Sequence, residues 1–167
     1  MKTYPDLVVT VKKEDRERRN LTEAKIGTHR VDAELVEQLR VLASFGGFDF
    51  TIDESPERGG TNRGPPPLCY FLAGAVSCLM TQYAKLAIAK DVPLKSMKAV
   101  ARGHFDRQVG GAFTDMIYTI AIESPASQQA IKAIACEAEL MCYAHNTLKK
   151  SVRMQTNLTL NGKHLEL

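Results

Sequence analysis

The chain lacks a strong charge bias, which argues against two kinds of partner. Its 22 Lys and Arg residues stand against 19 Asp and Glu residues, so the net charge is only +3 over 167 residues. A protein that holds nucleic acid or an anionic membrane surface by electrostatics carries a larger positive excess. The basic run at residues 16–19 contains an acid, Glu17, and is typical of a solvated surface. We therefore expect neither nucleic acid nor a membrane among the partners.

The sequence also lacks an apolar leader and an unbroken hydrophobic run of membrane length. Residues 1–6 contain no apolar core of the kind a signal peptide needs. The most apolar stretch, which starts at Leu68, meets Thr81, Gln82 and Lys85 before the roughly 20 residues that a bilayer requires. Internal repeats and low-complexity segments are absent as well. We predict a cytoplasmic protein with a single domain over residues 1–167, of which residues 1–34 form N-terminal strands or an arm.

No C-x-x-C pair occurs among the four cysteines, and no histidine stands at zinc-finger distance from them. This spacing argues against a structural zinc site, so we expect no metal and no bound cofactor. Cytoplasmic thiols are kept reduced, and a disulfide in such a protein is usually transient and either catalytic or redox-sensing. The cysteines are Cys69, Cys78, Cys136 and Cys142.

What the sequence does contain is a long apolar helix around Cys78. Residues 65–90 predict one helix, because prolines suit its first turn and Pro93 prevents its continuation. An almost wholly apolar helix is expected to be buried on every side. Gly74 and Ala75 share a face with Cys78, which leaves room beside the thiol for another helix or a small substrate. The alternative is ordinary core packing, with the cysteine as a small hydrophobic residue.

Hydrophobic patterns over the rest of the chain predict an α+β fold, with two helices among antiparallel strands. A second helix is expected from Ser124-Pro125 through Met141, loosening at Asn146-Thr147. Residues 53–64 form a loop rich in turn-forming residues that leads into the Cys78 helix, and is either functional or a simple connection. For residues 31–42 we favour strands, although part of this segment has helical propensity. The remaining expected strands are residues 7–11, 48–52, 96–105, 113–122 and 152–160. A turn or hairpin tip is expected at residues 12–20, and a turn at residues 108–112.

Taken together, these segments resemble the OsmC/Ohr family over about residues 35–162. The first half of the resemblance is the run Asp53-Glu54-x-Pro56-x-x-Gly59-Gly60-Thr61-x-x-Gly64-Pro65-x-Pro67, followed by the helix with Gly74-Ala75-Val76-Ser77-Cys78. The second half is Glu123-Ser124-Pro125, then Cys142 and Asn146-Thr147-Leu148. The family's two cysteines fall on Cys78 and Cys142. The resemblance implies antiparallel curved sheets wrapped around two long central helices, in an intertwined homodimer with sites at the subunit interface.

The same resemblance implies a thiol peroxidase that reduces organic hydroperoxides in oxidative stress defence. Cys78 would attack the peroxide as a thiolate and become a sulfenic acid, and Cys142 would resolve it as a disulfide. A dithiol or lipoyl-type reductant would then restore the thiols. The arginine that the family uses comes from an N-terminal strand, and Arg40 is the candidate by position, with Arg30 behind it. The family's acid, nine or ten residues before the first cysteine, is replaced here by Cys69 or Leu68.

Two other interpretations stay open. One is a catalytically weak relative that binds a small apolar ligand in the interface cleft, which the missing acid favours. The other is a structural dimer whose buried thiols are inert. Glu139, His145 and Lys85 stand near the thiols in sequence and could assist them, although solvent-exposed roles are the simpler explanation for each. Cys69 and Cys136 are expected to pack in the core.

Overall fold

The computed structural model describes residues 4–106, 111–150, 158–160 and 163–165. Helices and strands within them form an α+β fold, as predicted. Its strands pair antiparallel throughout the described residues, in the groups β1-β2-β3, β4-β5 and β6-β7. The elements are α1 (Tyr4–Arg19), β1 (Asp32–Glu37), β2 (Arg40–Phe45), β3 (Phe48–Ile52), a 3-10 turn (Pro56–Arg58), α2 (Pro67–Ala89), β4 (Ser96–Phe105), β5 (Phe113–Glu123), α3 (Gln128–Met141), α4 (Tyr143–Lys149), β6 (Leu158–Leu160) and β7 (Lys163–Leu165).

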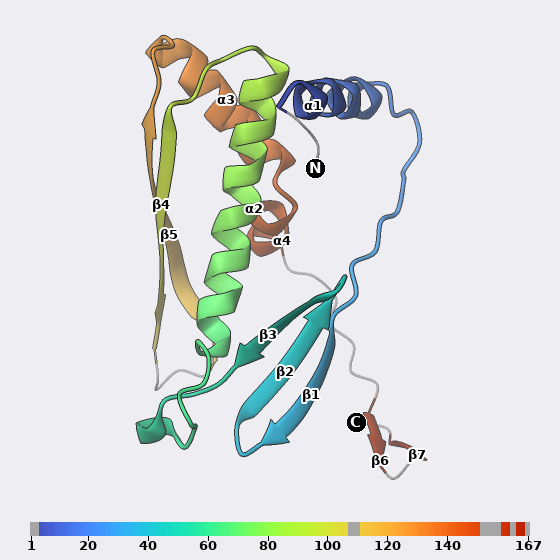
Figure 1. Ribbon diagram of the computed structural model, residues 1–167, viewed down its shortest axis with the longest axis vertical. Coiled ribbons are helices and arrows are strands. Elements are labelled where there is room, and N and C mark those ends of the chain that lie inside the picture. The colour runs from blue at the N-terminus through green and yellow to red at the C-terminus, as the bar shows by residue number, and fades with distance from the viewer. Residues whose placement is uncertain (1–3, 107–110, 151–157, 161–162, 166–167) are drawn as a thin grey trace.

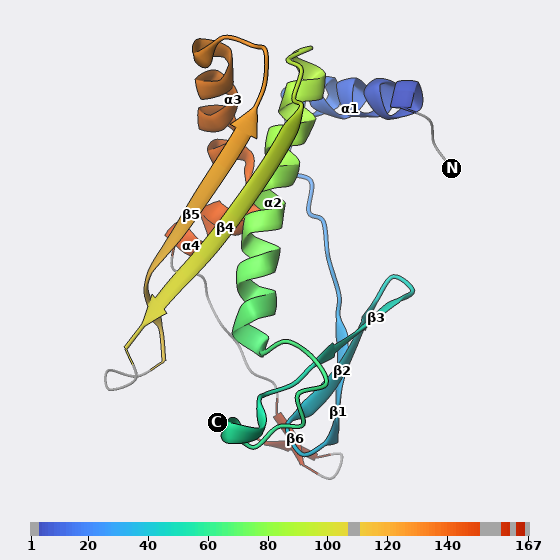
Figure 2. The same ribbon diagram turned by 60° about the vertical axis from the view of Figure 1, so that its left-hand side comes forward.

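Helix α2 is the axis of the molecule (Figure 1). The long β4-β5 ribbon runs beside it, and α3 and α4 pack on its C-terminal half (Figures 1 and 2). The β1-β2-β3 sheet lies at the N-terminal end of α2, while α1 crosses the other end. Strands at residues 31–42, 48–52, 96–105 and 113–122 are thereby confirmed, the first as the β1-β2 hairpin instead of a single extended strand. The predicted strand at 152–160 lies largely outside the described residues.

The core lies between the C-terminal half of α2 and helix α3. Leu79, Tyr83 and Leu86 recur every three or four residues and therefore line one face of α2. They pack against Ile134 and Ala138, which are 1% and 0% exposed on α3. Inward-facing residues of β4 and β5 cover the cluster from the side of the ribbon. This arrangement places the two helices that carry Cys78 and Cys142 directly against each other.

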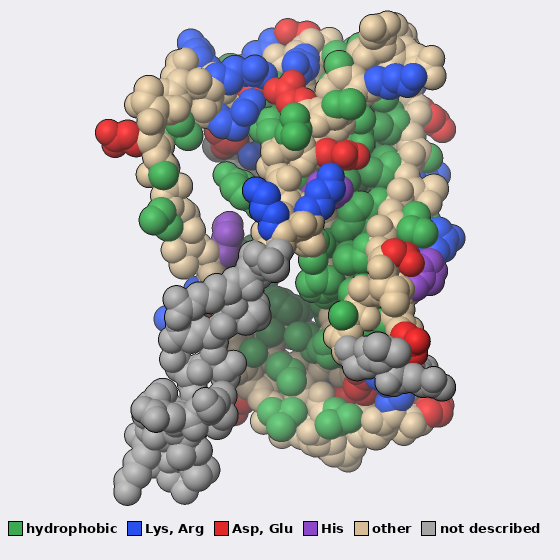
Figure 3. All heavy atoms as spheres, turned by 180° about the vertical axis from the view of Figure 1, so that it is seen from behind, with side chains coloured by type: hydrophobic (Ala, Val, Ile, Leu, Met, Phe, Trp, Pro, Cys, Tyr) green, Lys and Arg blue, Asp and Glu red, His purple; other side chains and the backbone are tan. Residues whose placement is uncertain are grey.

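The N-terminal half of α2 is not buried, contrary to the expectation for an apolar helix. Leu68 and Phe71 are each 44% exposed, and Gly74 has open space where a side chain would stand. Figure 3 shows hydrophobic side chains gathered in a band down the middle of one face of the chain. The local pattern correctly shows that this helix is apolar all round. The pattern does not show that the rest of the same chain buries only half of this helix.

In the part of the chain that the structure describes, α2 is the one helix long and apolar enough to cross a membrane by length and composition. The sequence argument that polar residues break its apolar run is therefore not sufficient by itself. Packing is the better criterion for telling a core helix from a membrane span, and the C-terminal half of α2 packs as a core helix against α3 and β4.

The N-terminal segment is a helix, so the strand predicted at residues 7–11 and the turn at 12–20 are wrong. Helix α1 has one buried residue, Val11, and ion pairs also join it to the rest of the chain. Lys12 Nζ lies 2.6 Å from Asp91 Oδ1, and Lys85 Nζ lies 2.8 Å from Glu14 Oε2. The β-branched residues that suggested a strand are helical here. Ion pairs between α1 and residues of α2 and its C-terminal end stabilise the helix.

Glu137 on α3 is the centre of the largest group of these ion pairs. Its carboxylate oxygens lie 2.9 Å from Arg19 Nη2, 3.5 Å from Arg18 Nη2 and 2.7 Å from Lys90 Nζ. The hydrogen bond with Lys90 is the main reason that the pKa of Glu137 is lowered. One carboxylate thus joins α1 to α3 and to the end of α2.

Glu137→Gln should lower the free energy of unfolding by about 1 kcal/mol, since it weakens several partly exposed ion pairs at once. The difference from the wild type should shrink in 1 M salt, which screens these pairs. Urea denaturation at low and high salt measures both effects. Glu23→Gln, on the exposed segment after α1, is the matched control. A loss that is independent of salt would contradict an electrostatic origin.

Helix α3 begins later than predicted, and a second helix, α4, follows it after a break at Cys142. Ser127 is the N-cap, and its Oγ accepts a hydrogen bond from the N–H of Ala130. Ser124 instead forms a turn, because its Oγ donates to the Pro93 carbonyl and accepts from the N–H of Ala126. Asn146 lies inside α4, where its side-chain amide donates to the Glu139 and Leu140 carbonyls at the C-terminal end of α3.

Candidate functional site

The loop at residues 53–64 fixes the start of the Cys78 helix. Asp53 is fully buried, and its carboxylate accepts hydrogen bonds from the backbone N–H groups of Glu54, Thr61 and Arg63 and from the Thr61 hydroxyl. These donors, led by the Thr61 hydroxyl, lower the pKa of Asp53 to about 2. The Asp53 N–H in turn donates to the Pro65 carbonyl. The loop is therefore folded around one carboxylate.

Two glycines let this loop close on itself. A Cβ atom at Gly60 would stand 2.0 Å from the Glu54 carbonyl oxygen, and one at Gly64 would stand 2.2 Å from the Thr51 carbonyl oxygen. The same Thr51 carbonyl accepts a hydrogen bond of 2.8 Å from the hydroxyl of Tyr70 on α2. The first turns of α2 are therefore attached both to the loop and to β3.

The thiols of Cys78 and Cys142 face each other in the core. Cys78 lies in the middle of α2 and is half-buried, while Cys142 lies between α3 and α4 and is 0% exposed. Cys78 packs against the core cluster that contains Cys142, close enough to raise the pKa of the Cys142 thiol. They come from helices far apart in the sequence, and no disulfide joins them in the structure.

Burial raises the pKa of the Cys142 thiol, and the hydrogen bond with Cys78 raises it further. The N–H groups of His145 and Ala144, at the start of α4, act in the opposite direction and only partly offset the burial. Cys142 is the N-cap residue of α4, although its sulfur makes no regular capping hydrogen bond. Cys142 is thus the more enclosed of the two thiols, and burial makes it hard to ionise.

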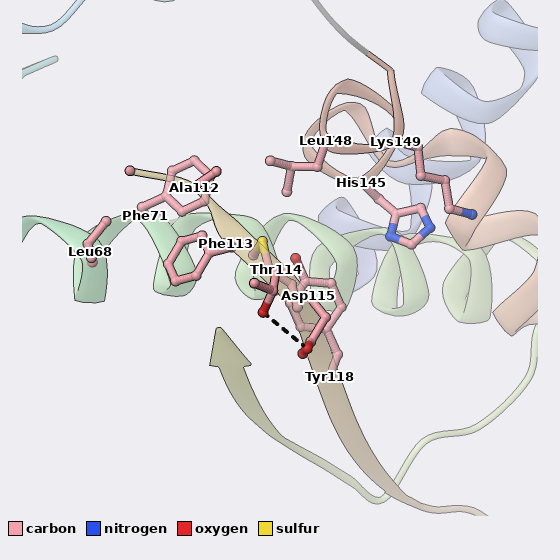
Figure 4. Close-up of a pocket in the computed structure, with 12 residues that line it drawn as sticks. Leu68, Phe71, Ala112, Phe113, Thr114, Asp115, Tyr118, His145, Leu148 and Lys149 are labelled. Atoms are coloured by element: carbon pink, nitrogen blue, oxygen red, sulfur yellow. Dashed lines mark hydrogen bonds between the residues drawn. The ribbon is translucent and has the colours of Figure 1, made fainter. Parts of the chain in front are cut away.

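Tyr118 on β5 connects the thiols with a cavity of about 640 Å³. Burial is the main cause of its raised pKa, and charge on Cys142 and Cys78 contributes as well. Figure 4 shows three walls of this cavity, which come from α2, β5 and α4. The wall residues are Leu68, Phe71, Gly111, Ala112, Phe113, Thr114, Asp115, Met116, Tyr118, His145, Leu148 and Lys149. Nothing in the sequence indicated that Tyr118 would stand between the thiols and this cavity.

Aromatic rings form the apolar wall of this cavity. Phe71 stacks on Phe113, with ring centroids 5.8 Å apart and an interplanar angle of 16°. Phe71 stands seven residues before Cys78, about two helical turns, so the wall leads along one face of α2 toward the thiol. Gly103 leaves the space that Phe113 occupies, because a Cβ there would lie 2.4 Å from the ring. Leu68, one of the two positions at which the family resemblance leads us to expect an acid, is part of this wall.

The candidate arginines are held by neighbours in their own segments. Nη2 of Arg40 lies 2.9 Å from Glu37 Oε2 within the β1-β2 hairpin, and Arg30 pairs with Asp32. Arg40 Nε is buried and has no hydrogen-bond partner among the described residues. The structure thus places Arg40 at a partly buried position in the β1-β2-β3 sheet, whereas the thiols lie against the β4-β5 ribbon.

The remaining sequence candidates separate into two groups. His145 reaches the cavity wall, and Glu139 Oε2 lies 4.0 Å from its Nε2. Lys85 instead pairs with Glu14 of α1.

Cys69 and Cys136 are exposed in this chain, so the expectation that they pack in the core is wrong. Within the described residues, no group of three or more His, Cys, Asp or Glu side chains is placed to hold a metal ion.

Comparison with known proteins connects this site to a family. Residues 60–157, more than half of the chain, match the model of a family described as OsmC-like protein. A curated protein named hydroperoxide reductase, from Mycoplasma genitalium, is 26% identical over 137 residues, which are 80% of this chain and 96% of that protein.

Solved structures show the same fold. An OsmC-like protein from Mycoplasma pneumoniae superposes with a TM-score of 0.68 at 24% identity, and the match covers 76% of this chain and 91% of that one. An organic hydroperoxide resistance protein from Legionella pneumophila gives a TM-score of 0.59 at 16% identity over 75% of this chain and 92% of that one. In both, the likeness is one of fold.

Proposed function

Because this chain belongs to the OsmC-like protein family, we propose that it reduces organic hydroperoxides with the thiol pair of Cys78 and Cys142. The observation that carries the proposal is that Cys78 packs against the core cluster containing Cys142, and that Tyr118, which packs against the same cluster, lines an apolar cavity. The name of the Mycoplasma genitalium relative, hydroperoxide reductase, agrees with this activity.

The difference in accessibility supports the roles that we propose for the two thiols. Cys78 is half-buried on the helix that forms one cavity wall, whereas Cys142 is fully enclosed behind it. The Cys78 thiolate attacks the peroxide oxygen, the O–O bond breaks, an alkoxide leaves and takes up a proton, and Cys78 becomes a sulfenic acid. The Cys142 thiol then attacks the Cys78 sulfur, which forms the disulfide and releases water. Early closure of the disulfide protects Cys78 from further oxidation.

The surroundings of the thiols favour an organic substrate. Phe71, Phe113 and Leu68 give one end of the cavity an apolar surface, which takes up an alkyl or aryl group but offers little to hydrogen peroxide. Arg40, with a buried and unpartnered Nε within the described residues, is our proposed group for polarising the peroxide. A dithiol or lipoyl-type reductant would reopen the disulfide, and a cytoplasmic location suits a cycle that begins with two free thiols.

A homodimer is part of the proposal. The N-terminal half of α2 leaves Leu68 and Phe71 exposed, and Leu35, Phe45 and Phe48 are exposed on the β1-β2-β3 sheet. A second copy of the chain that covered these surfaces would also close the cavity beside Cys78. It would place groups of its own near the site, and Arg40 would then act across the interface.

The test is stoichiometric. The reduced protein receives one equivalent of cumene hydroperoxide, the free thiols are quenched, and the disulfides are mapped by mass spectrometry. We expect a Cys78–Cys142 disulfide in the wild type and none in Cys78→Ser. Cys69→Ser and Cys136→Ser remove exposed thiols and serve as matched controls that should still form it. If all four wild-type thiols stay reduced over minutes, the proposed activity is wrong.

The replacement of the expected acid by Leu68 in the cavity wall favours a second candidate function, the binding of a small apolar ligand. A protein of this kind would take up an apolar fluorescent probe in the cavity without oxidation of Cys78. Phe71→Asp places a charge in the wall and should abolish uptake of the probe. Uptake by a protein whose thiols do not react would replace the first proposal with the second.

A further inference from the structure

One partly buried histidine, three residues after Cys142, has no assigned task. Among the described residues, three buried side-chain nitrogen or oxygen atoms lack a hydrogen-bond partner, namely Arg40 Nε, Glu54 Oε2 and His145 Nε2. Of these three residues, His145 alone lines the cavity, and its side chain is 17% exposed. A buried polar atom without a partner is costly and calls for an explanation. A proton that moves through this nitrogen during the reaction would provide one.

The position of His145 in α4 brings it close to Cys142. Cys142 is the N-cap residue of this helix, and His145 is the third residue after it. A side chain at this third position can reach back over the N-cap residue, as the glutamate of a capping box does. The N–H of His145 already faces the Cys142 sulfur. In Figure 4 the His145 imidazole lies at the α4 end of the cavity, on the same side as Leu148.

The groups around His145 come from every element at this end of the cavity. Glu139 on α3 approaches Nε2 to 4.0 Å and is itself about half exposed. Lys149 belongs to α4, Tyr118 and Asp115 belong to β5, and all three line the same cavity. The thiols of Cys78 and Cys142 complete the set of titratable groups. Glu139 is placed to stabilise the imidazole once it has gained a proton.

We propose that His145 accepts the proton of the Cys142 thiol as this thiol attacks the Cys78 sulfenic acid. The Cys142 sulfur bonds to the Cys78 sulfur, and the Cys78 S–O bond breaks. The imidazolium then returns the same proton to the departing hydroxide, which leaves as water. The step neither gains nor loses electrons beyond those already exchanged with the peroxide. This inference rests on the proposed function and adds the residue that enables its second step.

The need for such an acceptor follows from the position of Cys142. A thiol is a nucleophile only as the thiolate, and burial makes the Cys142 thiolate hard to form. Imidazole can exchange protons near neutral pH, where a carboxylate is too weak a base and an amine is already protonated. Because Cys142 is enclosed, its thiol needs a nearby proton acceptor, and His145 is placed to be one.

The test separates the two steps in the variant His145→Gln. The reduced protein is mixed with one equivalent of cumene hydroperoxide and quenched at intervals, with dimedone to trap sulfenic acid and mass spectrometry to follow the disulfide. We expect Cys78 to be oxidised at the wild-type rate, sulfenic acid to accumulate, and the disulfide to close roughly 100-fold more slowly, as for the loss of a general base. His29→Gln, an exposed histidine against Phe45, is the matched control.

Two further measurements exclude a merely structural effect. Imidazole added to His145→Ala should speed disulfide closure without changing the first oxidation. In the wild type, the rate of closure should rise with pH and reach a plateau as an imidazole loses its proton, and His145→Gln should lack this phase. If His145→Gln does not fold, the wild-type pH profile still decides, because closure that shows no such phase between pH 5 and 8 overturns the inference.

The outcomes distinguish this inference from the proposed function. Wild-type closure in a folded His145→Gln overturns the role of His145 and leaves the peroxidase cycle intact. Absence of both sulfenic acid and disulfide in the wild type refutes the cycle itself, and the inference with it. Accumulated sulfenic acid in His145→Gln, with rapid closure in the wild type and in His29→Gln, supports both.

Discussion

Cys142→Ser is expected to stop catalytic turnover while leaving the first oxidation of Cys78 intact. Under the proposed cycle the reductant acts on the disulfide, and a serine cannot form one. Excess cumene hydroperoxide should then drive Cys78 through sulfenic acid to sulfinic acid, which thiols do not reduce. Peroxide consumption with a dithiol reductant should fall to background after about one equivalent. Mass spectrometry should show two oxygen atoms added at Cys78.

The controls for this experiment come from the chain itself. Cys142→Ala tests whether the buried hydroxyl of serine disturbs the core, because it removes the thiol without adding a polar group. Cys136→Ser changes an exposed thiol six residues earlier and should turn over normally. Sustained turnover in both Cys142 variants would mean that the reductant acts directly on the Cys78 sulfenic acid, and would remove Cys142 from the cycle.

Asp53→Ala should be the most destabilising change in the loop that leads to α2. The substitution leaves the N–H groups of Glu54, Thr61 and Arg63 without their acceptor inside a closed loop. We expect a larger fall in melting temperature than for Glu137→Gln, together with faster amide exchange in the first turns of α2. Glu57→Ala, on the exposed side of the same loop, is the control and should change little. Equal melting temperatures for the two variants would show that the loop does not depend on Asp53.

The same carboxylate predicts how stability responds to acid. The pKa of Asp53 is about 2 in the folded chain and near 3.9 in an unfolded one. The unfolded state therefore binds a proton first as the pH falls. The contribution of Asp53 to stability is complete above about pH 4 and is lost progressively between pH 4 and 2. Asp53→Asn should be less stable at pH 6 and should lose less stability across that interval. Urea titrations at pH 6, 4 and 2 measure both differences.

Sequence patterns predicted the elements whose packing is local and repetitive. The long helix α2, strands β3, β4 and β5, and most of α3 follow from periodicities that each element carries in its own residues. The N-terminal helix was missed because its stability depends on contacts with residues distant in the sequence. Its β-branched start favours a strand, and the charges that stabilise it as a helix lie on Asp91, Lys85 and Glu137, far along the chain. Propensity gives way here to tertiary contacts.

For the site, the sequence suggested candidate residues but not their neighbours. The apolar helix around Cys78 and the family resemblance singled out Cys78 and Cys142, and Cys78 packs against the core cluster that contains Cys142. It could not show that Tyr118 and His145 stand beside them, because those contacts depend on how a strand and a short helix meet α2. Exposure was the least predictable property. Cys69 is apolar enough for a core position, yet a single chain leaves it uncovered.

The segment between α1 and β1 gives α1 the properties of a tethered ligand. Residues 20–31 are exposed along their whole length and run beside the molecule from one end toward the other (Figure 1). A flexible connection of this kind keeps its two ends at an effective concentration on the order of 1 mM. Ion pairs too weak to hold a separate peptide can therefore hold α1, because it rebinds before it diffuses away. The covalent continuity of the segment thus contributes to the docking of α1 together with the charges that α1 presents.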